Sequence, residues 1–128
     1  MMRHNDITSA VIDTSIDIHR RTGPGLLESV YRKILAYEMD KKGFQVQTEQ
    51  PIPVIWNDMR LELGFRADII INNLVIVETK SVESVHPVHK KQLLTYLRLT
   101  DMRVGLLINF NVELLKDGIS RVVNNLPE

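Results

Sequence analysis

The sequence has no cysteine, no net charge and no long apolar run. Without cysteine there is no disulfide, thiolate metal site or cysteine nucleophile, which is typical of a reducing compartment. The 16 basic residues balance the 16 acidic ones, so a protein that coats nucleic acid through bulk charge is not expected. No apolar stretch approaches the ~20 residues of a membrane span, and the first residues lack the layout of a secretory signal. These absences predict a cytoplasmic globular protein.

Apolar residues at helical spacing mark the first part of the chain. The length and ordinary composition predict one domain over residues 1–128. A first helix, ending at the Gly-Pro-Gly of 23–25, is predicted to bury one face: Ile7, Val11, Thr14 and Ile18. A second helix over about 26–42, ended by Gly43, is predicted to have this apolar side: Leu27, Val30, Ile34 and Tyr37.

The apolar period changes to two residues from Phe44 onward, which predicts strands. Pro51 and Pro53 would confine the short strand over 52–56 to a sheet edge, or would mark its beginning, because proline cannot donate a ladder hydrogen bond. Nearly continuous apolar runs on either side of Asn72-Asn73 predict a hairpin of central strands that are covered on both faces.

The last third of the chain alternates helix and strand. A helix beginning near Pro87, followed by a strand over 103–110, implies a crossover connection and a parallel strand pair. A short edge strand is expected at 118–123. The predicted order is ααββββαβ plus a short C-terminal strand. The predicted fold class is therefore α/β (α+β), with a mixed β-sheet flanked by helices.

Three charged residues lie where burial should exclude charge. Asp68 begins an isoleucine run, while Glu78 and Lys80 end an aliphatic run and share one strand face because they are two residues apart. A two-residue hairpin loop would send Asp68 and Glu78 to opposite faces. A three-residue loop over 72–74 would pair them and bring Lys80 to the same side. We predict an odd-length loop or a bulge.

Two carboxylates and a backbone carbonyl at one strand end suit a hard divalent cation such as Mg²⁺, which takes oxygen ligands and keeps several waters. The alternative is an ordinary ion pair of Glu78 with Lys80 at the strand end, with Asp68 capping a turn. Zinc is disfavoured, because His86 and His89 form an H-x-x-H with no evident partner pair.

Two helices carry polar residues at helical spacing. His89, Gln92 and Tyr96 share one face of the third helix, although a stripe that simply faces water would have the same pattern. Glu28 and Tyr31 share a face of the second helix. Taken alone, Glu28 is most simply a solvated residue near a helix N-terminus.

Residues 25–31, G-L-L-E-S-V-Y, contain G-x-x-E-x-x-Y, and the chain resembles the GxxExxY family of the PD-(D/E)xK nuclease-like superfamily. Four further blocks follow in order: G-F-R-A-D at 64–68, V-E-T-K at 77–80, P-V-H-K-K-Q-L-L-T-Y-L at 87–97 and V-G-L-L-I-N-F-N at 104–111. The resemblance covers nearly the whole chain. It implies a restriction-endonuclease-like core, in which a mixed sheet is flanked by helices.

The resemblance also implies metal-assisted hydrolysis of phosphodiester bonds in nucleic acid, with DNA favoured over RNA. Asp68, Glu78 and the Thr79 backbone carbonyl would hold Mg²⁺ or Mn²⁺, with Glu28 binding directly or through water. The ion would polarise the phosphate and acidify a bound water. Lys80 would position that water or stabilise the charge developing on the phosphorane.

The third helix supplies the remaining implied site residues. Gln92 and Tyr96 match a Q-x-x-x-Y and would orient the phosphate or a metal-bound water. His89 would touch the substrate backbone, and Lys90 and Lys91 would line a nucleic-acid groove.

Two positions depart from the superfamily pattern. Thr79 stands where an aliphatic residue is expected, and Ala67 stands where a proline precedes the aspartate. A nuclease fold does not by itself guarantee activity. The alternatives are a non-catalytic nucleic-acid- or protein-binding module that retains the fold, and a structural homodimerisation domain, which an exposed apolar edge strand near the C-terminus would support. No G-x-x-x-x-G-K-[ST] is present, which argues against an NTPase.

Overall fold

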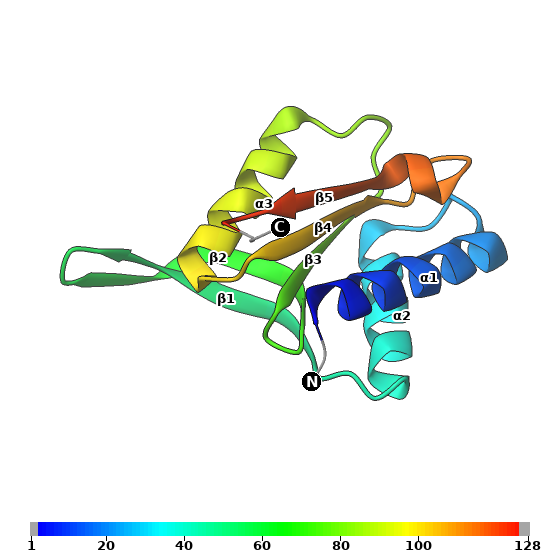
Figure 1. Cartoon of the computed structure of the whole chain (residues 1–128). Coiled ribbons are helices and arrows are strands. Elements are labelled where there is room, and N and C mark those ends of the chain that lie inside the picture. The colour runs from blue at the N-terminus through cyan, green and yellow to red at the C-terminus, as the bar shows by residue number, and fades with distance from the viewer. Residues whose placement is uncertain (1–2, 126–128) are drawn as a thin grey trace.

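A computed structural model describes residues 3–125 and shows one sheet with helices on both faces (Figure 1). Helices α1 (His4–Thr22) and α2 (Glu28–Lys41) pack on one face, and α3 (Pro87–Thr100) covers the other. The other elements are β1 (Val46–Trp56), β2 (Met59–Ile71), β3 (Val75–Lys80), β4 (Val104–Asn109), the 3-10 helix η1 (Leu115–Gly118) and β5 (Ile119–Val123).

The five strands follow the spatial order β1-β2-β3-β4-β5. Strands β3 and β4 pair in parallel, and the other neighbours pair antiparallel. Helix α3 connects the parallel pair, because parallel neighbours require a long crossover. The predicted mixed sheet flanked by helices is therefore confirmed, as is the short C-terminal edge strand.

The strand count before α3 is three, whereas the sequence predicts four. Strand β1 continues through Pro51 and Pro53, which is possible because β1 lies at the sheet edge and needs no outward ladder bond there. Its register against β2 shifts between Ile52 and Val54, around the second proline. Strand β2 also runs unbroken from Met59 to Ile71, because both of its halves pair with β1.

The predicted buried face of α1 is confirmed, but the predicted apolar side of α2 is wrong except at Ile34, which is half-buried and packs against the core. Leu27 and Tyr37 are 73% and 64% exposed. The residues that α2 buries are Tyr31, Leu35 and Met39. The ring of Tyr31 stacks on Phe110 with centroids 4.3 Å apart, and burying an aromatic side chain outweighs burying the smaller Val30.

The core lies in two layers, one on each side of the central strands. Alternate residues of β3 and β4 point to opposite faces, so both faces need apolar side chains. Val77 and Ile108 pack under α1 and α2, while Ile76 and Leu107 pack under α3. In the part of the chain that the structure describes, no helix is long and apolar enough to cross a membrane.

Candidate functional site

The β2–β3 hairpin has the odd register that the sequence predicts. Ile69 lies opposite Val77, and Ile71 lies opposite Val75. Three residues, 72–74, therefore form the loop. Asn72 and Asn73 have φ values of 52° and 53°, a left-handed conformation that asparagine tolerates better than most residues. This register places Asp68 opposite Glu78.

Hydrogen bonds join Asp68 and Glu78 at the point where β2 and β3 separate. The Asp68 N–H donates to Oε2 of Glu78 at 3.1 Å. Oδ2 of Asp68 accepts from the Thr79 N–H at 2.9 Å and from Thr79 Oγ1 at 3.2 Å. Arg32 of α2 lies beyond this pair, with Nη1 3.8 Å from Oδ1 of Asp68. The structure thus brings the two predicted acids into one site.

The surroundings of Glu78 favour its protonated form. The side chain is buried, and burial raises its pKa from the ordinary 4.5 to about 9, with help from the Asp68 charge and a hydrogen bond between the two carboxyl groups. The Asp68 N–H bond and the Lys80 charge act in the opposite direction but do not compensate. The end of β3 therefore holds two neighbouring carboxyl groups, and ionising both at once costs free energy.

Tyr96 closes the α3 side of this site. It is 6% exposed, and its ring lies 5.1 Å from that of Phe65. Burial raises the pKa of Tyr96 to about 12, with smaller contributions from the charges of Glu78 and Asp68. The Tyr96 hydroxyl is therefore neutral at physiological pH and lies within electrostatic reach of both acids.

Lys80, His89 and Glu28 lie around the open end of β3. The Lys80 side chain is half-buried and lowers the pKa of Glu78 through its charge. Burial lowers the pKa of His89, and the positive charges of Lys80 and His86 lower it further, whereas Glu28 raises it. Nδ1 of His89 is buried and has no hydrogen-bond partner among the described residues.

Other predicted site residues are less closely gathered. Gln92, Lys90 and Lys91 are exposed on α3, on the helix that carries Tyr96. Glu28 is the first residue of α2 and is half-buried. Within residues 3–125, no three or more histidine, aspartate or glutamate side chains form a group that could hold a metal ion, so Glu28 does not join the two acids in such a group.

Sequence reasoning missed Arg32 and Asn109. Arg32 is 16% exposed and is shared between Asp68 and Glu49, whose Oε1 lies 3.2 Å from Nη2. Its position four residues after Glu28, on the same helical face, is a signal that could have revealed it. Asn109 is buried in β4, where its side chain accepts from the Val82 N–H at 3.1 Å and donates to the Val82 carbonyl at 2.9 Å. These two bonds fix the backbone just after Lys80. A polar residue inside an apolar run is the sequence signal that could have identified Asn109.

Tyr31 holds the loop that leads into Glu28. Its hydroxyl donates to the Gly23 carbonyl and accepts from the Leu26 N–H at 3.1 Å. Gly23 itself has φ 74°, which favours glycine at the end of α1. The tyrosine of the G-x-x-E-x-x-Y motif therefore fixes the start of α2 and with it the position of Glu28.

Replacing Tyr31 with phenylalanine is expected to lower the free energy of unfolding by about 1–2 kcal/mol, because the ring stays packed while two loop hydrogen bonds are lost. Thermal denaturation measures this as a Tm lower by several degrees. The matched control is Tyr37→Phe, since Tyr37 is exposed on the same helix. Equal Tm values for the two variants would contradict the role given to the hydroxyl.

Thr79 has a specific partner at the position where an aliphatic residue was expected. Thr79→Val keeps the buried volume but removes the hydroxyl donor from Asp68, so we expect a loss of about 1–2 kcal/mol in the free energy of unfolding. Thr48→Val, at an exposed position of β1, is the control and should change stability by less than about 0.5 kcal/mol. Denaturant titration of both variants measures these free energies of unfolding, and equal values would contradict the role given to the Thr79 hydroxyl.

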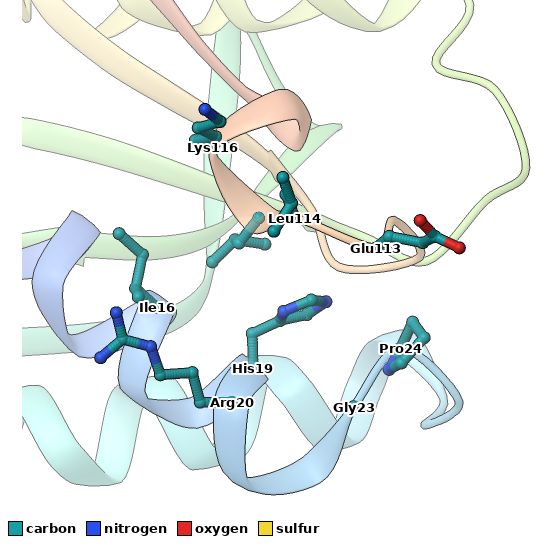
Figure 2. A pocket seen from close by; sticks show the side chains of 9 residues that line it. Ile16, His19, Arg20, Gly23, Pro24, Glu113, Leu114 and Lys116 are labelled. Atoms are coloured by element: carbon teal, nitrogen blue, oxygen red, sulfur yellow. The ribbon is translucent and has the colours of Figure 1, made fainter.

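A cavity of about 400 Å³ lies elsewhere, between the end of α1 and the segment around η1 (Figure 2). The side chains of His19 and Leu114 approach it from its two sides. Nε2 of His19 contacts the Val112 carbonyl at 2.8 Å. None of the acids of the site lines this cavity, so its size does not make it the candidate site.

One family model matches most of the chain. The PD-(D/E)XK nuclease superfamily matches residues 5–122, a span that includes Glu28, Asp68, Glu78 and Lys80. No curated protein and no solved structure gives a match. Because the match covers nearly the entire sequence, the chain belongs to the PD-(D/E)XK nuclease superfamily.

Proposed function

We propose that the protein is a metal-dependent nuclease that hydrolyses phosphodiester bonds of nucleic acid. The observation that carries this proposal is the convergence of Asp68 and Glu78 beside Lys80 at the end of β3. Strand pairing alone does not require two acids at this point, and their proximity raises the pKa of Glu78. A perturbed pKa next to other charged groups is typical of functional sites.

The donor chemistry fits Mg²⁺ or Mn²⁺. Both ions prefer oxygen ligands, and Mg²⁺ commonly uses one or two carboxylates with waters and substrate phosphate. The Thr79 N–H points toward Asp68 on the β2 side. In a strand, the N–H and C=O of one residue face the same neighbour, so the Thr79 carbonyl also faces the acids. Asp68, Glu78 and this carbonyl would hold the ion, and Glu28 could bind it through water.

Each remaining residue has a role set by its position. The bound ion would polarise the phosphate and lower the pKa of a water molecule. The Lys80 ammonium, next to Glu78, would hold the attacking water or stabilise charge developing on the phosphate oxygens. The neutral Tyr96 hydroxyl can donate a hydrogen bond to a phosphate or a water, and Gln92 would assist from the same helix.

The family branch, the nucleic-acid substrate and the cellular compartment are proposed from the sequence. We place the chain in the GxxExxY branch because the Tyr31 hydroxyl bonds the loop that precedes α2, and Glu28 is the first residue of that helix. We propose DNA as the substrate, with contacts from His89, Lys90 and Lys91, and the cytoplasm as the compartment. The alternative is a module that retains the fold and binds nucleic acid or protein without cleaving, and the exposed position of Gln92 favours it.

The test is a cleavage panel with linear duplex DNA, circular DNA, single-stranded DNA and RNA, each in Mg²⁺, Mn²⁺ or chelator. We expect cleavage with either ion and none with chelator. Glu78→Ala should abolish cleavage, because it removes one of the two acids. The control is Glu113→Ala, an exposed acid outside the site.

A thermal scan with divalent ions runs beside this panel. A ligand that binds only the native protein raises its Tm, so Mg²⁺ should stabilise the wild-type protein and not Glu78→Ala. Cleavage that survives in Glu78→Ala would identify a contaminant. Retention of nucleic acid without cleavage under every condition would contradict the nuclease and support the binding module.

A further inference from the structure

Arg32 connects two carboxylates that lie on different strands. Its Nη1 lies 3.8 Å from Oδ1 of Asp68 on β2, and its Nη2 lies 3.2 Å from Oε1 of Glu49 on β1. The side chains of Arg32 and Asp68 are 16% and 19% exposed, whereas that of Glu49 is 54% exposed. One guanidinium therefore faces a mostly buried acid, which we assign to the metal site, and an exposed acid outside that site.

The backbone of Glu49 departs from the strand that contains it. Glu49 has φ 50° in the interior of β1, a left-handed conformation that costs free energy for a residue with a side chain. The residues on either side of Glu49 pair with the two neighbours of Asp68, so Glu49 is level with that acid. Strained residues persist where their surroundings hold them, and they occur often at functional sites. The ion pair with Arg32 connects this strained residue to the candidate site.

The two oxygens of Asp68 have partners that differ in how easily they can move. Oδ2 accepts two hydrogen bonds from Thr79, which is buried in the middle strand of the sheet. Oδ1 faces the Arg32 guanidinium at a distance that is too long for a hydrogen bond. Arg32 has a long side chain and already pairs with a second carboxylate. Arg32 is therefore the partner that can leave Asp68 without breaking the sheet.

We propose that Arg32 is the counter-charge of Asp68 in the metal-free protein, and that it moves to Glu49 alone when Asp68 and Glu78 bind Mg²⁺ or Mn²⁺. The inference rests on the metal site of the proposed function but not on cleavage. A guanidinium close to Asp68 repels a divalent cation, so Arg32 lowers the affinity for the ion. Glu49 offsets this effect, because it gives Arg32 a partner away from the ion. Arg32 and Glu49 are thus positioning residues that set the metal affinity without binding the metal.

Isothermal titration calorimetry with Mg²⁺, in the absence of nucleic acid, measures the Kd of the wild type, Arg32→Met and Glu49→Gln. Methionine keeps much of the arginine stem and removes the charge, so Arg32→Met should lower the Kd for Mg²⁺ roughly 10-fold. Glu49→Gln should raise the Kd roughly 3-fold, because Arg32 then stays at Asp68. A Kd of Arg32→Met within about 2-fold of the wild type would overturn the inference.

The double variant separates a movement of Arg32 from the summed effect of two independent charges. If Glu49 acts through Arg32, Glu49→Gln has no further effect once Arg32 is replaced, and the double variant should have the Kd of Arg32→Met. Independent charges would instead add, so the double variant would bind Mg²⁺ roughly 3-fold more weakly than Arg32→Met. That additive result would overturn the movement from Asp68 to Glu49.

Lys33→Met is the matched control for the loss of charge. Lys33 is exposed on α2 next to Arg32 and carries the same charge. Successive residues of a helix point about 100° apart, so Lys33→Met should keep the Kd for Mg²⁺ within about 2-fold of the wild type. A Kd lowered as much in Lys33→Met as in Arg32→Met would show a general charge effect and overturn the specific role of Arg32.

Thermal denaturation gives a second measurement. In chelator, Arg32→Met should have a lower Tm than the wild type, because Asp68 loses its counter-charge. Mg²⁺ should then raise the Tm of Arg32→Met by more than that of the wild type, and that of Glu49→Gln by less. Glu49→Gln changes an exposed side chain, so it keeps the test decisive if Arg32→Met does not fold. Equal Mg²⁺-induced rises in Tm for the wild type and the folded variants would overturn the inference.

Metal binding and cleavage can fail separately. Mg²⁺ binding with the expected pattern of Kd values but without cleavage would contradict the nuclease and support this inference. Cleavage by a protein whose Kd for Mg²⁺ does not respond to Arg32→Met would overturn this inference and leave the nuclease in place. Binding of neither Mg²⁺ nor Mn²⁺ by the wild type or any variant would overturn both.

Discussion

Lys80→Met is expected to reduce metal-dependent cleavage roughly 10²–10³-fold, the effect of removing one donor that stabilises transition-state charge. The Lys80 ammonium lies next to Glu78 at the end of β3, and it is held there partly because Asn109 braces the chain at Val82. Methionine preserves most of the length and the apolar stem, so packing should be largely retained. Single-turnover cleavage assays measure the loss.

Metal binding separates a catalytic role of Lys80 from a structural one. Removing a positive charge beside the two acids should not weaken cation binding, so Mg²⁺ should raise the Tm of Lys80→Met at least as much as that of the wild type. The control is Lys41→Met, an exposed lysine at the far end of α2 from Glu28. Cleavage by Lys80→Met within about 2-fold of the control would remove Lys80 from the reaction.

Glu78→Gln is expected to stabilise the metal-free protein at pH 8 by roughly 1–3 kcal/mol, because glutamine fills the same buried place without a charge to desolvate. The pKa of Glu78 is raised to about 9 from an ordinary 4.5. Between these values the native protein holds a proton that the unfolded chain has released. The stability of the wild type contributed by this group is therefore complete below about pH 4.5 and is lost as the pH rises through about 9.

The measurement is the Tm of both proteins from pH 5 to 9. The gain of Glu78→Gln over the wild type should be small at pH 5 and should grow with pH. Mg²⁺ should reverse the ranking at pH 8, since it binds the ionised carboxylate of the wild type and displaces the proton. Glu113→Gln, at an exposed position, should show neither trend. A difference between Glu78→Gln and the wild type that shrinks with rising pH would contradict the assigned pKa direction.

Much of the fold follows from local sequence patterns. The period of α1, the glycine after it and the parallel pair joined by α3 are properties of short segments, and all three agree with the structure. The apolar side of α2 does not follow, because it depends on a contact between Tyr31 and Phe110, nearly eighty positions apart. Helical spacing alone gives Val30 and Tyr31 neighbouring directions and cannot choose between them.

The number of strands also depends on contacts between residues that are far apart in the sequence. Pro51 and Pro53 mark strand ends in a central position but not at a sheet edge, and edge status is a property of the whole sheet. The register of the β2–β3 hairpin was predicted because only one of two loop lengths brings Asp68 opposite Glu78. The spacing of Arg32 from Glu28 indicates a shared helix face, but the contact of Arg32 with Asp68 also depends on where α2 crosses the sheet, which the spacing does not give.

The hydrogen bonds around Asp68 bear on whether folding would need the proposed metal ion. Asp68 accepts from Thr79 twice and has Arg32 nearby, while the raised pKa of Glu78 lets it stay protonated at neutral pH. The polypeptide thus compensates its own acids without outside help. Zinc fingers fold only when their ion binds. We expect this chain, in contrast, to fold without the proposed ion and to bind it afterwards. Protein dialysed against EDTA should accordingly remain folded, and the proposed cleavage should appear when Mg²⁺ is added back.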